Sequence, residues 1–217
     1  MNITLQQNCW NGFEPAVISL PDEWDVAWHG IPGDDVPALT DEEIIERLRK
    51  PYGSEPLSEL AKGKERVVIL FDDITRATPT HRMAKAVLAE LHAAGVKKEQ
   101  IIFICALGTH GAHTRMDFVK KLGEDIVRDY AVYNHNPYEN CVQIGTTQRG
   151  VPVYINAEFM AADLRIGLGA ITPHPFNGFG GGGKILFPGV ASVDTIQQNH
   201  STAVDFLAKN NLNPVIA

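Results

Sequence analysis

The segment DDITRATP, at residues 72–79, combines two carboxylates, two hydroxyls and an arginine directly after an apolar run. The planar guanidinium of Arg76 forms charge-assisted pairs with carboxylates and phosphates, and the start of a following helix would add partial positive charge. The segment would therefore suit an anionic ligand. Helix N-capping with a surface ion pair explains the same residues about equally well.

A second segment, GTHG at residues 108–111, places a histidine between glycines. Imidazole titrates near neutral pH, so His110 is a candidate acid or base. His113 follows three residues later, and this HxxH spacing leaves open a zinc site completed by a distant carboxylate. An exposed loop histidine without a catalytic role is the plainer alternative.

The third segment, TPHPFNGFGGGGK at residues 172–184, is the most informative, because five of its last seven residues are glycine. Such a run costs conformational entropy and packs poorly, so it is expected where backbone amides lie against a ligand. The pattern GxxxxGK is present, but Ile185 stands where a P-loop needs Ser or Thr for Mg²⁺, which disfavours a nucleoside triphosphatase. Lys184 is a candidate covalent attachment point, with a solvated lysine as the alternative.

A further histidine, His200, lies within a helical pattern near the end of the chain. Imidazole is a good ligand for nickel, copper and zinc. Asp194 lies six residues earlier and off the same helical face, so helical spacing supplies no second ligand. A lone helical histidine is more often structural, and the residues themselves leave both interpretations open.

The alternation of apolar runs with helical patterns predicts the fold class. It is an α/β protein with a Rossmann-like, mostly parallel sheet and helices on both faces. Strands buried on both faces are expected at 66–71, 100–107 and 164–169, shorter strands at 130–133 and 151–155, and helices at 83–94, 116–122 and 192–208. Residues 1–64 are expected to form an irregular N-terminal segment with short strands, ahead of an α/β core at 65–217. One helix in this segment is capped by Thr40 with Glu43 and ended by Pro51.

Each of the three long predicted strands ends in polar residues that could do chemistry. Asp72 and Asp73 follow the first strand, His110 the second and His174 the third. Because ligands of open parallel sheets bind outside the carboxyl ends of the strands, these residues are predicted to converge on one cleft together with Lys184.

Composition excludes several classes of function. The formal net charge is −7, with no basic cluster, which disfavours nucleic-acid binding. The N-terminus lacks the pattern of a signal peptide and no apolar stretch is long enough to span a membrane. The three cysteines are widely separated and form neither a CxxC pair nor a disulfide framework, so a cytoplasmic protein is expected.

The motifs DDITRATP (72–79), ALGTH (106–110), ITPHPFNGFGGGGK (171–184), FPGVAS (187–192) and NH (199–200) resemble, in order and spacing, the N-terminal domain of the nickel-dependent lactate racemase family. The resemblance extends over nearly the whole chain and implies a single N-terminal racemase-type domain at 1–217. The family's C-terminal domain would then be missing from this chain. Gly111, His113 and Gly180 depart from the residues expected in the family, which bears on the substrate more than on the cofactor.

The resemblance also implies roles for individual residues. Lys184 would attach a nickel-pincer pyridinium-3,5-bisthiocarboxylic acid mononucleotide, and His200 would be the protein ligand of its nickel. Asp73, Thr75 and Arg76 would line the cofactor phosphate or the substrate carboxylate. His110 and His174 would be an acid–base pair for the two enantiomers of a 2-hydroxy acid, whose α-hydrogen leaves and returns as hydride.

The resemblance thus implies an isomerase, a racemase or epimerase of lactate-type 2-hydroxy acids. Its partners would be the small-molecule substrate and the proteins that make the cofactor, and homo-oligomerisation is left open. A non-catalytic nucleotide- or cofactor-binding module using the same glycine loop is the first alternative. A zinc hydrolase built on His110 and His113 is the second.

Overall fold

A four-stranded parallel sheet forms the centre of the molecule, in the order β5-β4-β3-β8. Its strands are β3 (Val67–Phe71), β4 (Ile101–Cys105), β5 (Ala131–Asn134) and β8 (Leu164–Leu168). The computed structural model describes residues 1–5, 14–27, 29, 33, 36–174 and 178–210. The sheet confirms the predicted α/β class and its parallel strands.

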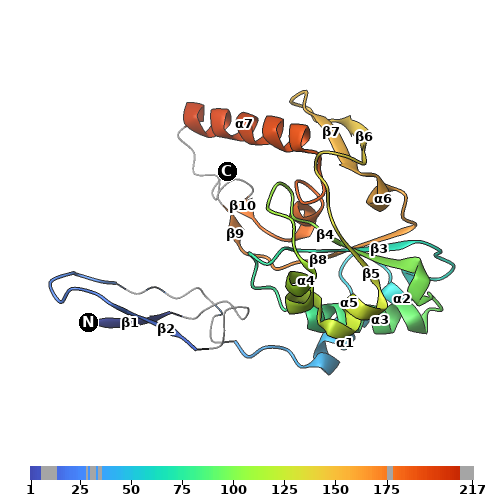
Figure 1. The fold of residues 1–217 in the computed structure, drawn as a ribbon, viewed down its shortest axis with the longest axis horizontal. Helices are drawn as coiled ribbons and strands as arrows, with labels where there is room; N and C mark the ends of the chain where they lie inside the picture. Colours follow the sequence, from blue (N-terminus) through green and yellow to red (C-terminus); the bar gives the residue numbers. More distant parts are fainter. Residues whose placement is uncertain (6–13, 28, 30–32, 34–35, 175–177, 211–217) are drawn as a thin grey trace.

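The strand order places a topological switch point between β3 and β8. The chain adds β4 and then β5 on one side of β3, and later returns to add β8 on the other side. Loops that leave β3 and β8 at their carboxyl ends therefore diverge and leave a crevice between them. The predicted chemistry-bearing segments follow β3, β4 and β8, so this topology brings them to one edge of the sheet (Figure 1).

Side chains of β3 alternate between two apolar clusters because successive residues of a strand point to opposite faces. Val67, Ile69 and Phe71 pack on the side covered by helices. That side carries α3 (Thr80–Ala93), α4 (Arg115–Leu122) and α5 (Glu124–Asp129), with α1 (Asp41–Arg49) and α2 (Leu57–Leu60) beyond them (Figure 1). All five residues of β3 are buried, which confirms the prediction from its apolar run.

Val68 and Leu70 point to the opposite face, where a second cluster includes residues such as Ile155, Phe159 and Ile196. This face is covered by the hairpin of β6 (Cys141–Thr146) and β7 (Pro152–Asn156), by α6 (Ala157–Met160) and by the start of α7 (Val193–Asn210) (Figure 1). Helices thus lie on both faces as predicted, but a hairpin shares the second face with them.

Two strand predictions need correction. The strand expected at 151–155 exists as β7, but it pairs antiparallel with β6 outside the parallel sheet. The strand at 164–169 was expected to be buried on both faces, whereas only Leu168 of β8 is buried. The reason is that β8 lies at the edge of the sheet, where Arg165 and Gly167 are exposed.

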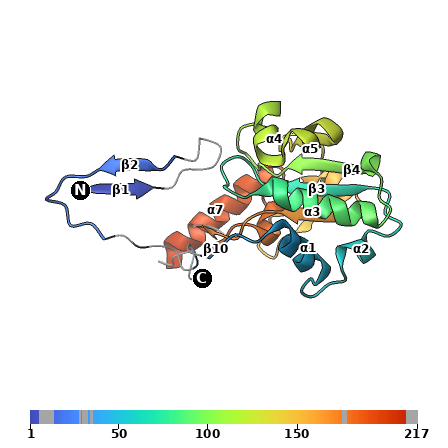
Figure 2. The same cartoon turned by 90° about the horizontal axis from the view of Figure 1, so that it is seen from below.

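The N-terminal segment contains the expected elements. Thr40 and Glu43 form a reciprocal capping box at the start of α1, as predicted. The strands β1 (Asn2–Leu5) and β2 (Ala16–Ser19) form an antiparallel hairpin that extends away from the sheet (Figures 1 and 2). Within the described part of the chain, no helix has the length and apolar character needed to cross a membrane.

The helix-covered core depends on Phe71, which is fully buried with its ring edge-on to Phe103 and Phe118 at centroid distances of 6.5 and 6.0 Å. Phe71→Ala leaves a cavity that the close-packed rings cannot fill, so it is expected to lower the free energy of unfolding by about 3–5 kcal/mol. Urea unfolding measures this. Tyr52→Ala, at a 98% exposed position, is the control and should change stability by less than about 0.5 kcal/mol. Equal effects of the two variants would contradict the assignment of the core.

Candidate active site

One cavity of about 570 Å³ opens at the carboxyl ends of β3, β4 and β8. Its lining combines the loop after β3, the loop after β4, the glycine-rich segment and two residues of α7, Ile196 and His200. Every residue to which the resemblance gives a role lines it, namely Asp73, Thr75, Arg76, His110, His174, Lys184 and His200. The predicted convergence on one cleft is therefore confirmed.

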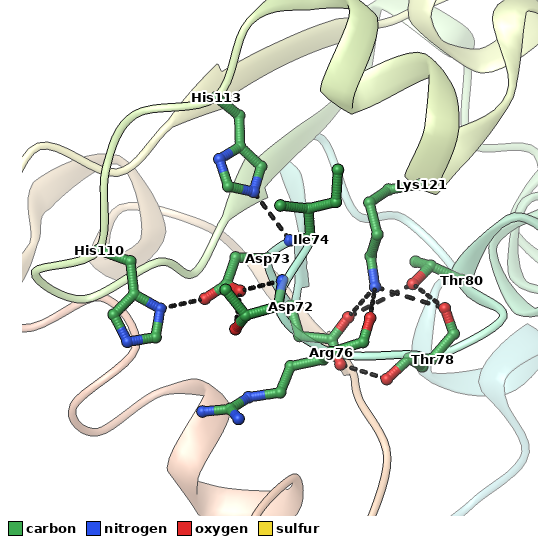
Figure 3. Close-up of polar contacts among 10 residues, drawn as sticks. Asp72, Asp73, Ile74, Arg76, Thr78, Thr80, His110, His113 and Lys121 are labelled. Carbon is green, nitrogen blue, oxygen red and sulfur yellow. Dashed lines mark hydrogen bonds and ion pairs between the residues drawn. The ribbon is translucent and has the colours of Figure 1, made fainter. Parts of the chain in front are cut away.

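A buried ion pair shapes the loop after β3. Lys121 of α4 is completely buried, and its Nζ lies 2.6 Å from Oδ1 of Asp72. The same ammonium group donates to the carbonyl oxygens of Arg76 at 3.0 Å and Thr78 at 3.3 Å, while the Thr78 hydroxyl donates to Asp72 (Figure 3). Because these contacts turn the loop carbonyls inward, the guanidinium of Arg76 extends to the side on which His110 lies (Figure 3).

Asp73 is the partner of His110. Its buried carboxylate lies 2.6 Å from Nδ1 of His110 and accepts hydrogen bonds from the backbone N–H and the hydroxyl of Thr75. Burial by itself would raise the pKa of Asp73, but the hydrogen bonds from Thr75 and His110 outweigh it and leave the pKa lowered. In the neutral form of His110, an ionised Asp73 holds the ring proton on Nδ1, so that the lone pair is on Nε2.

The HxxH spacing left open a zinc-ligand role for His113, but the structure gives its side chain another role. Its Nε2 accepts the backbone N–H of Ile74 at 2.8 Å, so this nitrogen is already engaged with the main chain (Figure 3). Among the residues described, no group of three or more His, Cys, Asp or Glu side chains is arranged to hold a metal ion. The described residues therefore supply no set of zinc ligands for the hydrolase alternative.

The glycine-rich segment brings Lys184 to the cavity. Gly181 has a φ of 67°, and a Cβ there would lie 2.6 Å from the carbonyl oxygen of Ala170, so only glycine permits this close approach. Lys184 follows on a short 3₁₀ turn, with its N–H bonded to the carbonyl of Gly181 at 2.9 Å. Burial, and then the positive charge of Arg76, lower the pKa of Lys184, which favours the nucleophilic neutral amine. Residues 175–177 of the motif lie outside the described residues.

His174 and His200 complete the cavity. His174 lies on β9 (Pro173–His174), which pairs with β10 (Gly178–Phe179). Burial lowers the pKa of His174, and the nearby charges of Lys184, Arg76 and His200 lower it further. His200 of α7 lies with Nδ1 2.8 Å from the carbonyl oxygen of Ile196. A neutral ring that donates from Nδ1 carries its lone pair on Nε2, the arrangement of a metal-ligating histidine.

Sequence reasoning missed the part played by Lys121. The signal was its position on the apolar face of the predicted helix 116–122, between Phe118 and Leu122, both of which are buried. A lysine at such a position needs a buried acceptor, because an unpaired buried charge is costly. The neighbouring pair Asp72 and Asp73 could have supplied that acceptor.

Comparison with known proteins shows that this chain is similar to the N-terminal part of lactate racemases. A family model described as the lactate racemase N-terminal domain matches residues 12–211. The lactate racemase of Lactiplantibacillus plantarum is 38% identical over 166 residues, which are 75% of this chain and 39% of that protein. The lactate racemase of Thermoanaerobacterium thermosaccharolyticum is 36% identical over 165 residues, 75% of this chain and 38% of that protein. The chain spans about two fifths of the length of these curated relatives.

Solved structures agree with this result. The lactate racemase apoprotein of T. thermosaccharolyticum superposes with a TM-score of 0.72 at 29% identity, covering 92% of this chain and 46% of that one. A protein from Thermotoga maritima superposes with a TM-score of 0.67 at 28% identity, covering 82% of this chain and 44% of that one.

Lys121→Met tests the buried ion pair. The variant keeps the apolar stem but leaves Asp72 buried without its cation, so the free energy of unfolding should fall by about 3–5 kcal/mol. Guanidinium unfolding measures the loss. Adding Asp72→Asn to Lys121→Met removes the uncompensated charge and should recover part of it. If the free energy of unfolding of Lys121→Met fell by less than about 1 kcal/mol, this would contradict a structural role for the ion pair.

Asp73→Asn tests the pKa of Asp73 through the pH dependence of stability. A carboxyl whose pKa is lower in the folded state stabilises the protein above its unfolded-state pKa of about 3.9, and this stabilisation is lost as the pH falls through the folded-state pKa. The stability advantage of the wild type over Asp73→Asn should therefore shrink across that acidic range. Urea unfolding at several pH values measures it, with Asp25→Asn as an exposed control. A pH-independent difference would contradict the lowered pKa.

Proposed function

This chain belongs to the lactate racemase N-terminal domain family, and from that membership we propose that it supplies the cofactor-holding and acid–base part of a racemase acting on a lactate-type 2-hydroxy acid. The observation that carries the proposal is the cavity at the sheet edge, where two histidines, an arginine, a lysine and a helical histidine meet. Because the chain spans about two fifths of its curated relatives, the activity proposed is that of the whole protein.

His110 and His174 are the proposed acid–base pair. Racemisation of a 2-hydroxy acid through its planar keto acid requires a base that takes the hydroxyl proton of one enantiomer and an acid that protonates the oxygen as the other enantiomer forms. Asp73 holds His110 with its lone pair on Nε2, and burial with neighbouring positive charge keeps His174 in its basic, neutral form. Two bases on the wall of one cavity allow either enantiomer to be deprotonated at its hydroxyl.

Arg76 is the proposed anion-binding residue, with Thr75 beside it. Its guanidinium would pair with the substrate carboxylate or with the phosphate of a nucleotide cofactor. An ionised Asp73 would repel an anion placed against it, so Asp73 is not proposed to bind the anion itself. Its contribution is to position His110 and Thr75 through its hydrogen bonds with them.

Lys184 and His200 are the proposed holders of a nickel-pincer mononucleotide. When bound, this group supplies the acceptor that takes up the α-hydrogen of the substrate and gives it back. The donor set fits, because Lys184 has a lowered pKa suited to covalent attachment and His200 offers one imidazole ligand. Proteins that make the cofactor would then be partners of this chain.

The proposal is tested with the full-length protein co-expressed with the cofactor-making proteins. Intact mass spectrometry should show a covalent adduct that is absent from Lys184→Arg, which keeps the charge but cannot form the same bond. The wild type should racemise at least one acid of a 2-hydroxy acid panel. His110→Asn and His174→Asn should each lower kcat by roughly 10²–10⁴-fold, because each removes a general acid–base group.

Two results would overturn this function. An adduct on Lys184 without racemisation of any acid in the panel would indicate a non-catalytic cofactor-binding module. Stoichiometric zinc without nickel in the purified protein would instead favour the hydrolase alternative.

A further inference from the structure

One hydrogen bond joins the two loops that carry Asp73 and His110. The backbone N–H of Ile74 donates to Nε2 of His113 at 2.8 Å (Figure 3). Ile74 follows Asp73 directly in the chain, and His113 follows His110 by three residues. The bond therefore connects the loop after β3 to the loop after β4 beside the Asp73–His110 contact.

The chemical state of His113 follows from its contacts. A backbone N–H can only donate, so Nε2 of His113 must be the acceptor and carries the lone pair. Nδ1 lies 3.2 Å from the carbonyl oxygen of Gly111, which accepts from a protonated Nδ1. A neutral ring with its proton on Nδ1 satisfies both contacts, whereas an imidazolium has no lone pair for Ile74.

The main chain of His113 is held from a third strand. Asn134, the last residue of β5, accepts the N–H of His113 at 3.0 Å through Oδ1 and donates from Nδ2 to the His113 carbonyl at 2.8 Å. The His113 ring also contacts Phe118 of α4 at a centroid distance of 6.3 Å. His113 is thus fixed at both its backbone and its ring. Through its hydrogen bond with the N–H of Ile74, it in turn fixes the peptide group between Asp73 and Ile74.

We propose that His113 is a positioning residue whose neutral imidazole locks the loop after β4 to the loop after β3 and so fixes the Asp73–His110 pair. His113 itself lies outside the cavity lining and acts through the backbone of Ile74. The inference that this affects an acid–base group rests on the function proposed above. The lock itself rests only on the contacts of Ile74, His113 and Asn134.

Two substitutions separate the acceptor from the rest of the side chain. His113→Phe keeps an aromatic ring against Phe118 but has no acceptor for Ile74. His113→Gln loses the ring but restores an acceptor oxygen at about the reach of Nε2. Both variants are made in the 217-residue chain, and neither measurement below requires cofactor or activity.

Hydrogen exchange by NMR measures the lock directly. In His113→Phe the amide of Ile74 should exchange roughly three- to tenfold faster, the loss expected for one net hydrogen bond. The amides of β3 should keep their wild-type rates, which shows that the loosening is local. In His113→Gln the rate at Ile74 should return towards that of the wild type.

The titration of Asp73, followed through its carboxyl ¹³C resonance, measures the effect on the pair. His110 contributes to the lowered pKa of Asp73, so a loosened pair in His113→Phe should move this pKa up towards its ordinary value. His113→Gln should restore the lower pKa. This rescue distinguishes an acceptor that positions the pair from a ring that only fills space.

Three outcomes would overturn the proposal. These are an unchanged exchange rate of Ile74 in His113→Phe, equal changes in the Phe and Gln variants, or faster exchange of Ile74 with an unchanged titration of Asp73. If His113→Phe does not fold, Asn134→Ala replaces it, because that variant keeps the imidazole but frees the His113 backbone and should also speed exchange at Ile74. Racemisation assays of the full-length protein remain separate, so failure of the enzymatic function leaves the NMR result interpretable.

Discussion

The ion pair between Lys121 and Asp72 is the interaction on which the geometry of the cavity depends. Burying an ammonium group is unfavourable unless oxygen acceptors replace its water, and here a carboxylate and two backbone carbonyls do so. Since both carbonyls belong to the loop after β3, the loop must curl around the amine. Its remaining polar side chains then face the cavity, which turns a helix packed on the sheet into a support for the site.

A layered arrangement follows from this interaction. Lys121 fixes the loop after β3, this loop presents Asp73, and Asp73 sets the tautomer of His110. The groups proposed to meet substrate are thus separated by one or two residues from the apolar core that holds them. His113 belongs to the supporting layer, although histidine is also a common metal ligand.

Much of this organisation could be predicted from the residues. The apolar runs that became β3 and β4 are long and uninterrupted, and the rule that parallel strands end at one edge brought Asp73, His110 and His174 together correctly. The cap of α1 was equally predictable, because Thr40 and Glu43 interact within four residues. These features depend on local chemistry or on a general property of sheets.

The rest depended on contacts between distant residues. The strand β6 was missed because its residues are mostly exposed and its pairing with β7 is interrupted by an irregularity between Gln143 and Gly145. The edge position of β8 is a matter of strand order, which periodicity does not encode. Likewise, the contact of His113 with Ile74 joins residues 39 positions apart, so HxxH spacing could not distinguish a ligand from a backbone acceptor.

The positive side chains in the cavity contrast with the negative net charge of the chain. The chain carries a formal charge of −7, yet the positive charges of Arg76 and Lys184 act on His174 across the same small space. Low-dielectric walls concentrate such a field, so a small anion that is repelled at long range would be attracted if it came close to Arg76. Under the function proposed above, salt would screen the weak outer repulsion more than the interior attraction, so capture of an anion here would be a short-range event.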